Sequence, residues 1–177
     1  SAAAIEASAS GIAVNEYLQS RSNTAVYAAG DAADTQGAPL TPVAVFEGKV
    51  AASNMLKGNQ TEPDYKGVPS VVFTIPELAR VGMLEEEAIE VGYQVRVAEN
   101  DTSGWYSNIR VGENCAGTKI IIDDDTDKIL GGHLLGHGYG ELVNFLGLAM
   151  RLGLTTGDLK KMVSAYPSVG SDLGSML

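Results

Sequence analysis

The stretch "NTAVYAAGDAAD", residues 23–34, decides the architecture of the first part of the chain. Its apolar run, residues 24–29, predicts a short buried strand. The run stops at Gly30, and a carboxylate, Asp31, follows directly in place of a turn-forming pair. Gly30 permits a close approach to the backbone, or a torsion that other residues avoid. Asp31 is therefore expected at the carboxyl end of the strand, where open α/β sheets hold their ligands.

A helix is predicted over residues 42–57, after a loop that contains glycine and proline. Thr41 is a suitable N-cap and Pro42 fits the first helical position. Gly48 in the helix interior predicts a closely packed neighbour, since glycine there costs about 1 kcal/mol relative to alanine. The free N–H groups of the first turn would form a polar clamp with Asp31 for a molecule that carries hydroxyls and an electron-rich edge. The local pattern leaves a second possibility open, in which Asp31 only caps a turn.

A domain boundary is predicted in the polar, proline-containing stretch "NQTEPDYKGVP", residues 59–69. It divides the chain into a first domain, residues 1–60, and a second domain, residues 61–177. The second domain carries β-branched or alternating runs that predict strands at 70–75, 80–84, 93–99, 118–123 and 128–136. A short helix is expected at 85–92. Antiparallel strands followed by two helices predict an α+β fold, preceded by a piece of an α/β domain.

The two C-terminal helices are predicted from apolar residues at helical spacing. The first helix would bury one wide face, made of Leu142, Phe145, Leu146, Ala149 and Leu152. The second would begin at a threonine N-cap, either Thr155 or Thr156. Its inward residues are expected to be Leu159, Met162 and Val163.

Charge and composition exclude several classes of partner. The net charge of −10 disfavours nucleic acid and anionic membranes, because phosphate binding needs clustered Lys and Arg. No apolar run approaches the roughly 18–20 residues of a membrane helix. A single cysteine, Cys115, rules out an internal disulfide and suits a cytoplasmic protein. The start "SAAAIEASAS" carries no signal peptide and no evident beginning of a domain, so we expect the C-terminal part of a longer protein.

Four segments, in order, resemble one enzyme family. "TAVYAAGDAAD" resembles the second FAD-binding motif of the pyridine nucleotide–disulfide oxidoreductases, the family of glutathione reductase and dihydrolipoamide dehydrogenase. "PLTPVAVFEGKVAASNML" is similar to the family segment that follows that motif. Residues 68–88 resemble the opening of the family's dimerisation domain, and residues 117–159 its hairpin and paired helices. The resemblance covers nearly all of the chain from Gly11 onward.

The resemblance implies a cofactor site and a homodimer. Asp31, beside Gly30, would hydrogen-bond the ribitol of FAD, and Leu40, Thr41 and Pro42 would lie against the pyrimidine edge of the flavin. NAD(P)H would be the electron donor of the full-length protein, and a small molecule its acceptor. The expected function is that of a C-terminal fragment of an FAD-dependent NAD(P)H oxidoreductase. The alternatives are a free-standing dimerisation module, or a flavoenzyme that reduces a non-disulfide acceptor such as a quinone or a metal ion.

The C-terminus departs from the family pattern. Members that act on dithiols end in His-Pro-Thr-x-x-Glu, in which the His is the acid–base catalyst for the partner subunit, whereas this chain has "AYPSVGSDLGSML". Tyr166 stands at the His position, and Ser171 stands at the Glu position with Asp172 beside it. A phenol, with a reference pKa of about 10, is a poor base at neutral pH. Disulfide reduction by the usual route is therefore in doubt, although Tyr166 could donate a hydrogen bond.

Three other groups of polar residues are interpreted as structural. His133 and His137 lie among glycines and have no evident third ligand, so no metal site is assigned. The acidic run "DDDTD", residues 123–127, lacks the Gly and Glu of a calcium loop and predicts a solvated hairpin turn. Cys115 has no basic neighbour in the sequence that would favour a redox role.

Overall fold

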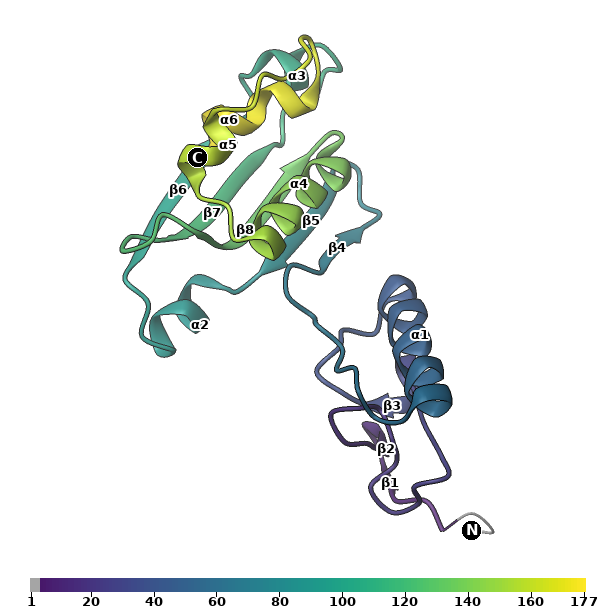
Figure 1. Cartoon of the computed structure of the whole chain (residues 1–177). Helices are drawn as coiled ribbons and strands as arrows, with labels where there is room; N and C mark the ends of the chain where they lie inside the picture. Colours follow the sequence, from purple (N-terminus) through teal and green to yellow (C-terminus); the bar gives the residue numbers. More distant parts are fainter. Residues whose placement is uncertain (1–3) are drawn as a thin grey trace. The chain divides into compact units, whose positions relative to one another are not determined.

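The structure is a computed structural model that describes residues 4–177, and these form two compact units (Figure 1). The first unit ends at Tyr65, and the second is Lys66–Leu177. No helix within residues 4–177 has the length and apolar character to cross a lipid bilayer.

The first unit is a small sheet with one long helix. Its strands are β1 (Ala7–Ser8), β2 (Gly11–Ala13) and β3 (Ala33–Asp34), and its helix is α1 (Thr41–Lys57). The sheet order is β1-β2-β3, and β2 runs parallel to β3. Its small core consists of Val14, Leu18, Ala28, Ala33, Val50 and Ala51. Parallel strands are normally covered on both faces, so this unit has the character of one edge of an α/β layer.

The strand predicted at residues 24–29 is wrong for the described chain. Tyr27 forms an isolated bridge to Gln19, and the backbone bonds from Ser20 to Val26 and from Ala28 to Leu18 flank it. Ala29 is extended, with φ −149° and ψ 160°, but residues 4–177 offer this segment no ladder partner, and a strand is defined by its ladder. Gly30–Ala32 then form a 3₁₀ turn, η1, that leads into β3. Asp31 consequently lies before a strand rather than at the end of one.

Helix α1 begins one residue earlier than predicted. Leu40 is the N-cap, Thr41 the first helical residue and Pro42 the second. The side chain of Leu40 has no oxygen atom, so the N-cap residue makes no capping hydrogen bond with its side chain. The close neighbour predicted for Gly48 is also absent: within residues 4–177, no atom beyond the nearby backbone of α1 would lie within 4 Å of a Cβ there.

The second unit contains a five-stranded antiparallel sheet, which confirms the predicted α+β class. Its order is β4-β5-β8-β7-β6. The strands are β4 (Pro69–Val72), β5 (Glu77–Gly82), β6 (Val95–Asp101), β7 (Gly117–Asp123) and β8 (Ile129–Gly136). Strands β7 and β8 form the predicted hairpin around the acidic turn. The short helices are α2 (Glu85–Glu90), α3 (Tyr106–Ile109), α5 (Thr156–Lys160) and α6 (Leu173–Met176), with a 3₁₀ turn, η2 (Val169–Asp172).

Helix α4 (Tyr139–Leu152) lies along one face of this sheet (Figure 1). Its buried residues Leu142 and Leu146 pack with Ile120 and Leu134 in the main core. Successive strand residues point to opposite faces, so Ile121, between Ile120 and Ile122, faces the other way. There it packs against Ala88 of α2 and Leu130 in a smaller cluster.

The predicted apolar face of α4 is correct only in part. Leu142, Leu146 and Ala149 are buried, but Phe145 is 43% exposed and Leu152 is 63% exposed. Val143 is buried in their place. In the next helix, Thr155 is the N-cap and Leu159 is buried as predicted. Residues 162 and 163 are exposed instead, because α5 ends at residue 160 and the chain beyond it leaves the core.

Candidate functional site

The turn that carries Asp31 is fixed against α1. Gly30 has a φ of +62°, in the left-handed region, and a Cβ there would lie 2.8 Å from the Cβ of Ala44. A larger residue would therefore push the turn away from the helix. The backbone N–H of Gly30 donates a hydrogen bond to Oε2 of Glu47 over 2.6 Å. Both contacts hold Asp31 close to the first turns of α1.

A cavity of about 430 Å³ opens beside this turn. Its lining includes Gly30 and the carboxylates of Asp31, Asp34 and Glu47. Leu40, Thr41 and Pro42 are not part of the lining, which includes Pro39 just before them and Glu47 further along α1. The structure thus brings Gly30 and Asp31 together at one cavity and leaves the start of α1 beside it.

Glu47 is the residue of this site that the sequence analysis missed. It is only 1% exposed, and its carboxylate also accepts hydrogen bonds from Oγ1 of Thr35 (2.8 Å) and from the hydroxyl of Tyr65 (2.6 Å). Burial, together with the hydrogen bond to Glu47, raises the pKa of Tyr65 to about 12. The available signal was spacing, because Glu47 lies four residues after Val43 and three before Val50, on the buried face of α1.

Tyr166 lies on the surface of the second unit, beside the ring of Tyr106. It is 77% exposed, and its ring centroid lies 6.1 Å from that of Tyr106, with 31° between the ring planes. The residues at the family's Glu position are engaged elsewhere: Ser171 donates to the carbonyl of Ser168, and Asp172 accepts from the hydroxyl of Ser107. Tyr166 is therefore accessible, and its ring lies beside the aromatic ring of Tyr106 rather than beside an orienting carboxylate.

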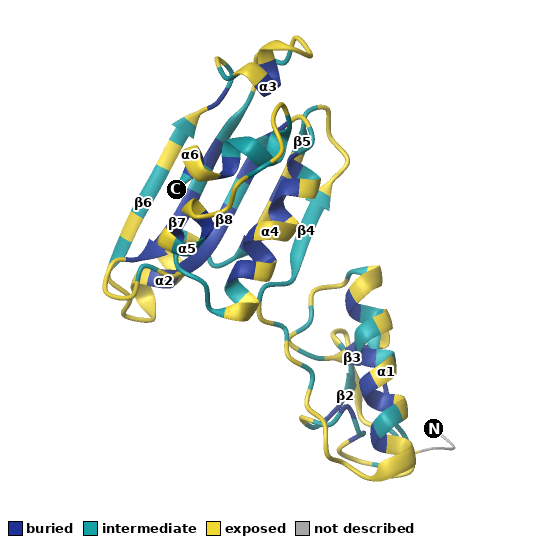
Figure 2. Cartoon of the chain, turned by 45° about the horizontal axis from the view of Figure 1, so that its top comes forward, coloured by how far each residue is buried: buried dark blue, intermediate teal, exposed yellow. Residues whose placement is uncertain are grey.

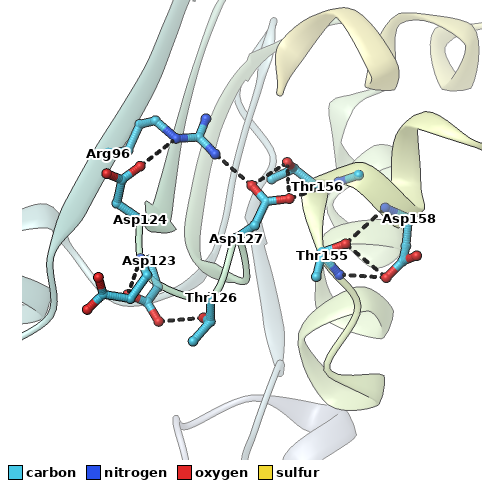
Figure 3. A network of polar contacts seen from close by, with 10 residues as sticks. Arg96, Asp123, Asp124, Thr126, Asp127, Thr155, Thr156 and Asp158 are labelled. Atoms are coloured by element: carbon cyan, nitrogen blue, oxygen red, sulfur yellow. Dashed lines mark hydrogen bonds and ion pairs between the residues drawn. The ribbon is translucent and has the colours of Figure 1, made fainter.

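The acidic hairpin turn joins the sheet to helix α5 (Figure 3). Asp127 accepts hydrogen bonds from Nη2 of Arg96 (2.6 Å), from Oγ1 of Thr156 (2.7 Å) and from the backbone N–H of Gly157 (3.0 Å). The Thr156 and Gly157 bonds, and more weakly the charge of Arg96, lower the pKa of Asp127. The predicted hairpin turn is confirmed, and its carboxylates brace the fold. Within residues 4–177, no group of three or more His, Cys, Asp or Glu side chains could hold a metal ion.

The two histidines and the cysteine are not among the residues that line the Asp31 cavity or the surface around Tyr166. His133, on β8, has its Nε2 3.1 Å from the carbonyl oxygen of Met83. His137 is exposed in the turn between β8 and α4, and Cys115 is an exposed free thiol.

Helix α4 has exposed positions along its length (Figure 2), and several of them carry large apolar side chains. Phe145, Leu148 and Leu152 lie at helical spacing and are 43%, 54% and 63% exposed. In the same unit, Phe73 and Ile75 in the loop after β4 are almost fully exposed. Large apolar side chains gathered on a surface mark an interaction site.

Comparison with protein families gives one match. The family model described as "Pyridine nucleotide-disulphide oxidoreductase, dimerisation domain" matches residues 68–176. These residues include all five strands of the sheet of the second unit.

Comparison with curated proteins gives relatives of two sizes. The chain is 49% identical over 173 residues to an uncharacterized 19.7 kDa protein in the mercuric resistance operon of Staphylococcus aureus. That match covers 98% of this chain and 96% of the relative. The chain is 32% identical over 173 residues to a mercuric reductase of Bacillus cereus, covering 97% of this chain and 27% of the reductase. It is 31% identical over 167 residues to a glutathione reductase of Nostoc, covering 93% and 36%.

A solved structure shares the fold of nearly the whole chain. The Cu(II) complex of the HOCl-induced flavoprotein disulfide reductase RclA from Escherichia coli matches with a TM-score of 0.84 and 26% identity. The match covers 97% of this chain and 39% of that one. The chain thus spans about a third of the reductases that it matches, and nearly all of the 19.7 kDa relative.

Proposed function

The chain belongs to the pyridine nucleotide–disulphide oxidoreductase family, and we propose that it supplies the homodimer interface and part of the flavin site of an FAD-dependent NAD(P)H oxidoreductase. The observation that carries the proposal is the exposed apolar stripe of α4, because it lies on the unit that matches the family's dimerisation domain. The proposal refers to the assembled enzyme, since the reductase relatives are about three times longer than this chain.

The dimer would be formed by a second copy of the chain seated on the outer face of α4. In a two-fold interface the same patch meets itself, so each apolar residue contributes twice. Phe145, Leu148 and Leu152 would then lose the water that they now contact. The direct test is the mass in solution, which is expected to be twice the 18.5 kDa of one chain. A monomer at micromolar concentration would contradict the proposed interface.

The cavity of the first unit fits the hydroxyl-bearing segment of FAD. Carboxylates accept hydrogen bonds from hydroxyl groups, and Asp31 lines the cavity with its carboxylate exposed. Gly30 keeps the backbone there open to a close approach. FAD, when bound, would supply the hydride and electron transfer. Thr41 and Pro42 begin α1, whose N-terminal dipole would stabilise negative charge on a neighbouring part of the cofactor.

The role of Asp31 is testable on the chain itself with riboflavin, which carries the sugar-alcohol chain without phosphate. Saturation-transfer NMR should show contacts from the sugar-alcohol protons in the wild type. Asp31→Ala should weaken binding by roughly ten- to a hundredfold, the value of a hydrogen bond to a charged group. Asp34→Ala, at the same cavity, is the matched control and should weaken it less. Equal effects of the two substitutions would contradict a specific role for Asp31.

The purified chain is expected to be colourless and unable to oxidise NADH. Its sequence contains no Gly-x-Gly-x-x-Gly stretch, the loop that binds the pyrophosphate of dinucleotides. Absorbance at the flavin band and an NADH oxidation assay check this. A yellow, active preparation would contradict it.

A metal ion is the second candidate for the electron acceptor. Tyr166 replaces the catalytic His of disulfide-reducing members, and the reported relatives include a mercuric reductase and a protein of a mercuric resistance operon. A hydride from NAD(P)H carries the two electrons that reduce Hg(II) to the metal, with release of one proton. Assays of the flavin-loaded enzyme with Hg(II), a quinone, glutathione disulfide and lipoamide would distinguish the acceptors. Preferential turnover of glutathione disulfide would exclude the metal-ion candidate.

A free-standing module is the alternative to an enzyme fragment. Nearly the whole length of the 19.7 kDa relative is covered by this chain, which favours a module of this size. The residues encoded upstream of Ser1 discriminate between the two. A long upstream reading frame with a dinucleotide-binding loop would support the enzyme, and a start site near Ser1 would support the module.

A further inference from the structure

Glu47 is a buried residue whose side chain lines the Asp31 cavity. It is 1% exposed and lies on the face of α1 that otherwise buries Val43 and Val50. A buried carboxylate is costly unless hydrogen bonds replace its hydration. Three donors satisfy it: the Gly30 N–H, the Thr35 hydroxyl and the Tyr65 hydroxyl.

The two oxygens of Glu47 have separate partners. Oε1 accepts from Thr35 and Tyr65, which tie α1 to the loop after β3 and to the end of the first unit. Oε2 accepts the hydrogen bond from the Gly30 N–H. One oxygen therefore anchors the carboxylate, and the other holds the turn that presents Asp31.

The bond to Glu47 attaches the turn to α1. The turn is three residues long, Gly30–Ala32, and buries none of them. The Ala33 N–H donates to the Gly30 carbonyl, which closes the turn on itself but does not attach it to the helix. Residues with few buried contacts open at low free-energy cost. The contact between Gly30 and Ala44 limits how the turn lies on α1, and the hydrogen bond from Gly30 to Glu47 fixes its direction against the helix.

We infer that Glu47 is the positioning residue of this cavity, which fixes the Gly30 turn so that the Asp31 carboxylate is held ready for the hydroxyls of a ligand. The inference rests on the proposed function only in naming that ligand as the sugar-alcohol segment of a flavin. Glu47 itself acts through the turn and needs no contact with the ligand.

The substitution Glu47→Met removes both acceptor oxygens and keeps a side chain of similar length. Glutamine would not test the bond, because its NH₂ group can donate to the Thr35 and Tyr65 hydroxyls while its oxygen still accepts from the Gly30 N–H. The matched control is Thr35→Ala with Tyr65→Phe, which removes the other two hydrogen bonds of the same carboxylate and leaves the Gly30 bond intact. Both variants should lower the melting temperature, so stability alone does not discriminate between them.

The readouts are backbone NMR signals of Gly30 and Asp31 in the full chain without ligand. In Glu47→Met, the Gly30 amide should exchange about ten- to a hundredfold faster, the value of a hydrogen bond to a carboxylate. The Asp31 order parameter should fall from about 0.85 to below about 0.6. In the double variant Thr35→Ala with Tyr65→Phe, both should stay as in the wild type. Unchanged order of Asp31 in Glu47→Met, or equal loosening in both variants, would overturn the inference.

The double variant also covers the case in which Glu47→Met does not fold. Thr35→Ala with Tyr65→Phe keeps the hydrogen bond from Gly30 to Glu47, and Asp31 should stay ordered; loss of its order would overturn the inference. A riboflavin titration of the same samples keeps two failures apart. Asp31 that is ordered by Glu47 but binds no riboflavin contradicts the proposed function alone, whereas riboflavin bound equally by wild type and Glu47→Met contradicts the positioning role alone.

Discussion

Leu148→Lys should split the dimer while leaving each subunit folded. Leu148 is the central residue of the exposed stripe on α4 and is 54% exposed in the single chain. Lysine is a good helix former, so α4 itself should tolerate it. In a self-complementary interface the two introduced ammonium groups would approach each other and lose their hydration.

The expected loss of dimerisation free energy follows from the exposed part of the Leu148 side chain. Full burial of a leucine side chain is worth about 1.5–3 kcal/mol. About half of that remains to be gained at Leu148, and the two-fold axis counts it twice, which gives roughly 1.5–3 kcal/mol per dimer. The dissociation constant should therefore rise by about ten- to two-hundredfold, before any repulsion between the lysines is added.

Sedimentation-velocity ultracentrifugation over a concentration series measures this change directly. Ile89→Lys is the matched control: it lies on α2, is 55% exposed, and belongs to the helix that packs on the opposite face of the sheet. It should leave the dissociation constant unchanged. Circular dichroism should show folded protein for both variants. If Leu148→Lys dimerises as tightly as the wild type, or Ile89→Lys dissociates equally, the α4 stripe is not the interface.

Three further predictions concern stability and are checked by denaturant or thermal unfolding. Leu146→Ala, at a fully buried position of α4, should cost about 2–5 kcal/mol. Gly67→Ala should cost at least about 1 kcal/mol, because φ is +67° and the new Cβ would lie 2.4 Å from the carbonyl oxygen of Gly147. The Lys161 ammonium, with the amide and hydroxyl of Thr155, lowers the pKa of Asp158 from 3.8 to about 2, so its contribution is complete above pH 4 and is lost as the pH falls through about 2. Asp158→Asn should flatten the pH dependence of the melting temperature in that window; an unchanged slope would contradict the assignment.

The elements of the second unit could be predicted because their signals are local. The β7–β8 hairpin was predicted at 118–123 and 128–136 and is found at Gly117–Asp123 and Ile129–Gly136. A β-branched run on one side of a short acidic turn, and an apolar run on the other, fix both strands and their pairing. The N-cap of α5 was narrowed to Thr155 or Thr156 from residues within one turn. Thr155 is the N-cap, and its side chain accepts a hydrogen bond from the backbone N–H of Asp158.

Glu47 could not be predicted by the same rules, because a charged residue in a helix is assigned to solvent by default. Its three donors come from positions 12 to 18 residues away in the sequence. Only the folded arrangement shows that they converge on one carboxylate. The candidate site was therefore located from Gly30 and Asp31, while the residue that holds their turn became visible only in the structure.

The remaining errors have a common physical cause. Residues 24–29, Gly48, Phe145 and Leu152 were all expected to have paired or closely packed neighbours. Within residues 4–177, residues 24–29 form a single bridge and no strand although Ala28 is buried, Gly48 has no close neighbour, and Phe145 and Leu152 are partly exposed. Hydrophobicity records burial in whatever assembly the chain forms, and it does not say which molecule provides the cover. The errors fall in both units, so two separate surfaces need an explanation. A monomeric result for the wild type would remove the explanation for Phe145 and Leu152 alone, because Gly48 and residues 24–29 belong to the unit that the dimerisation model does not match.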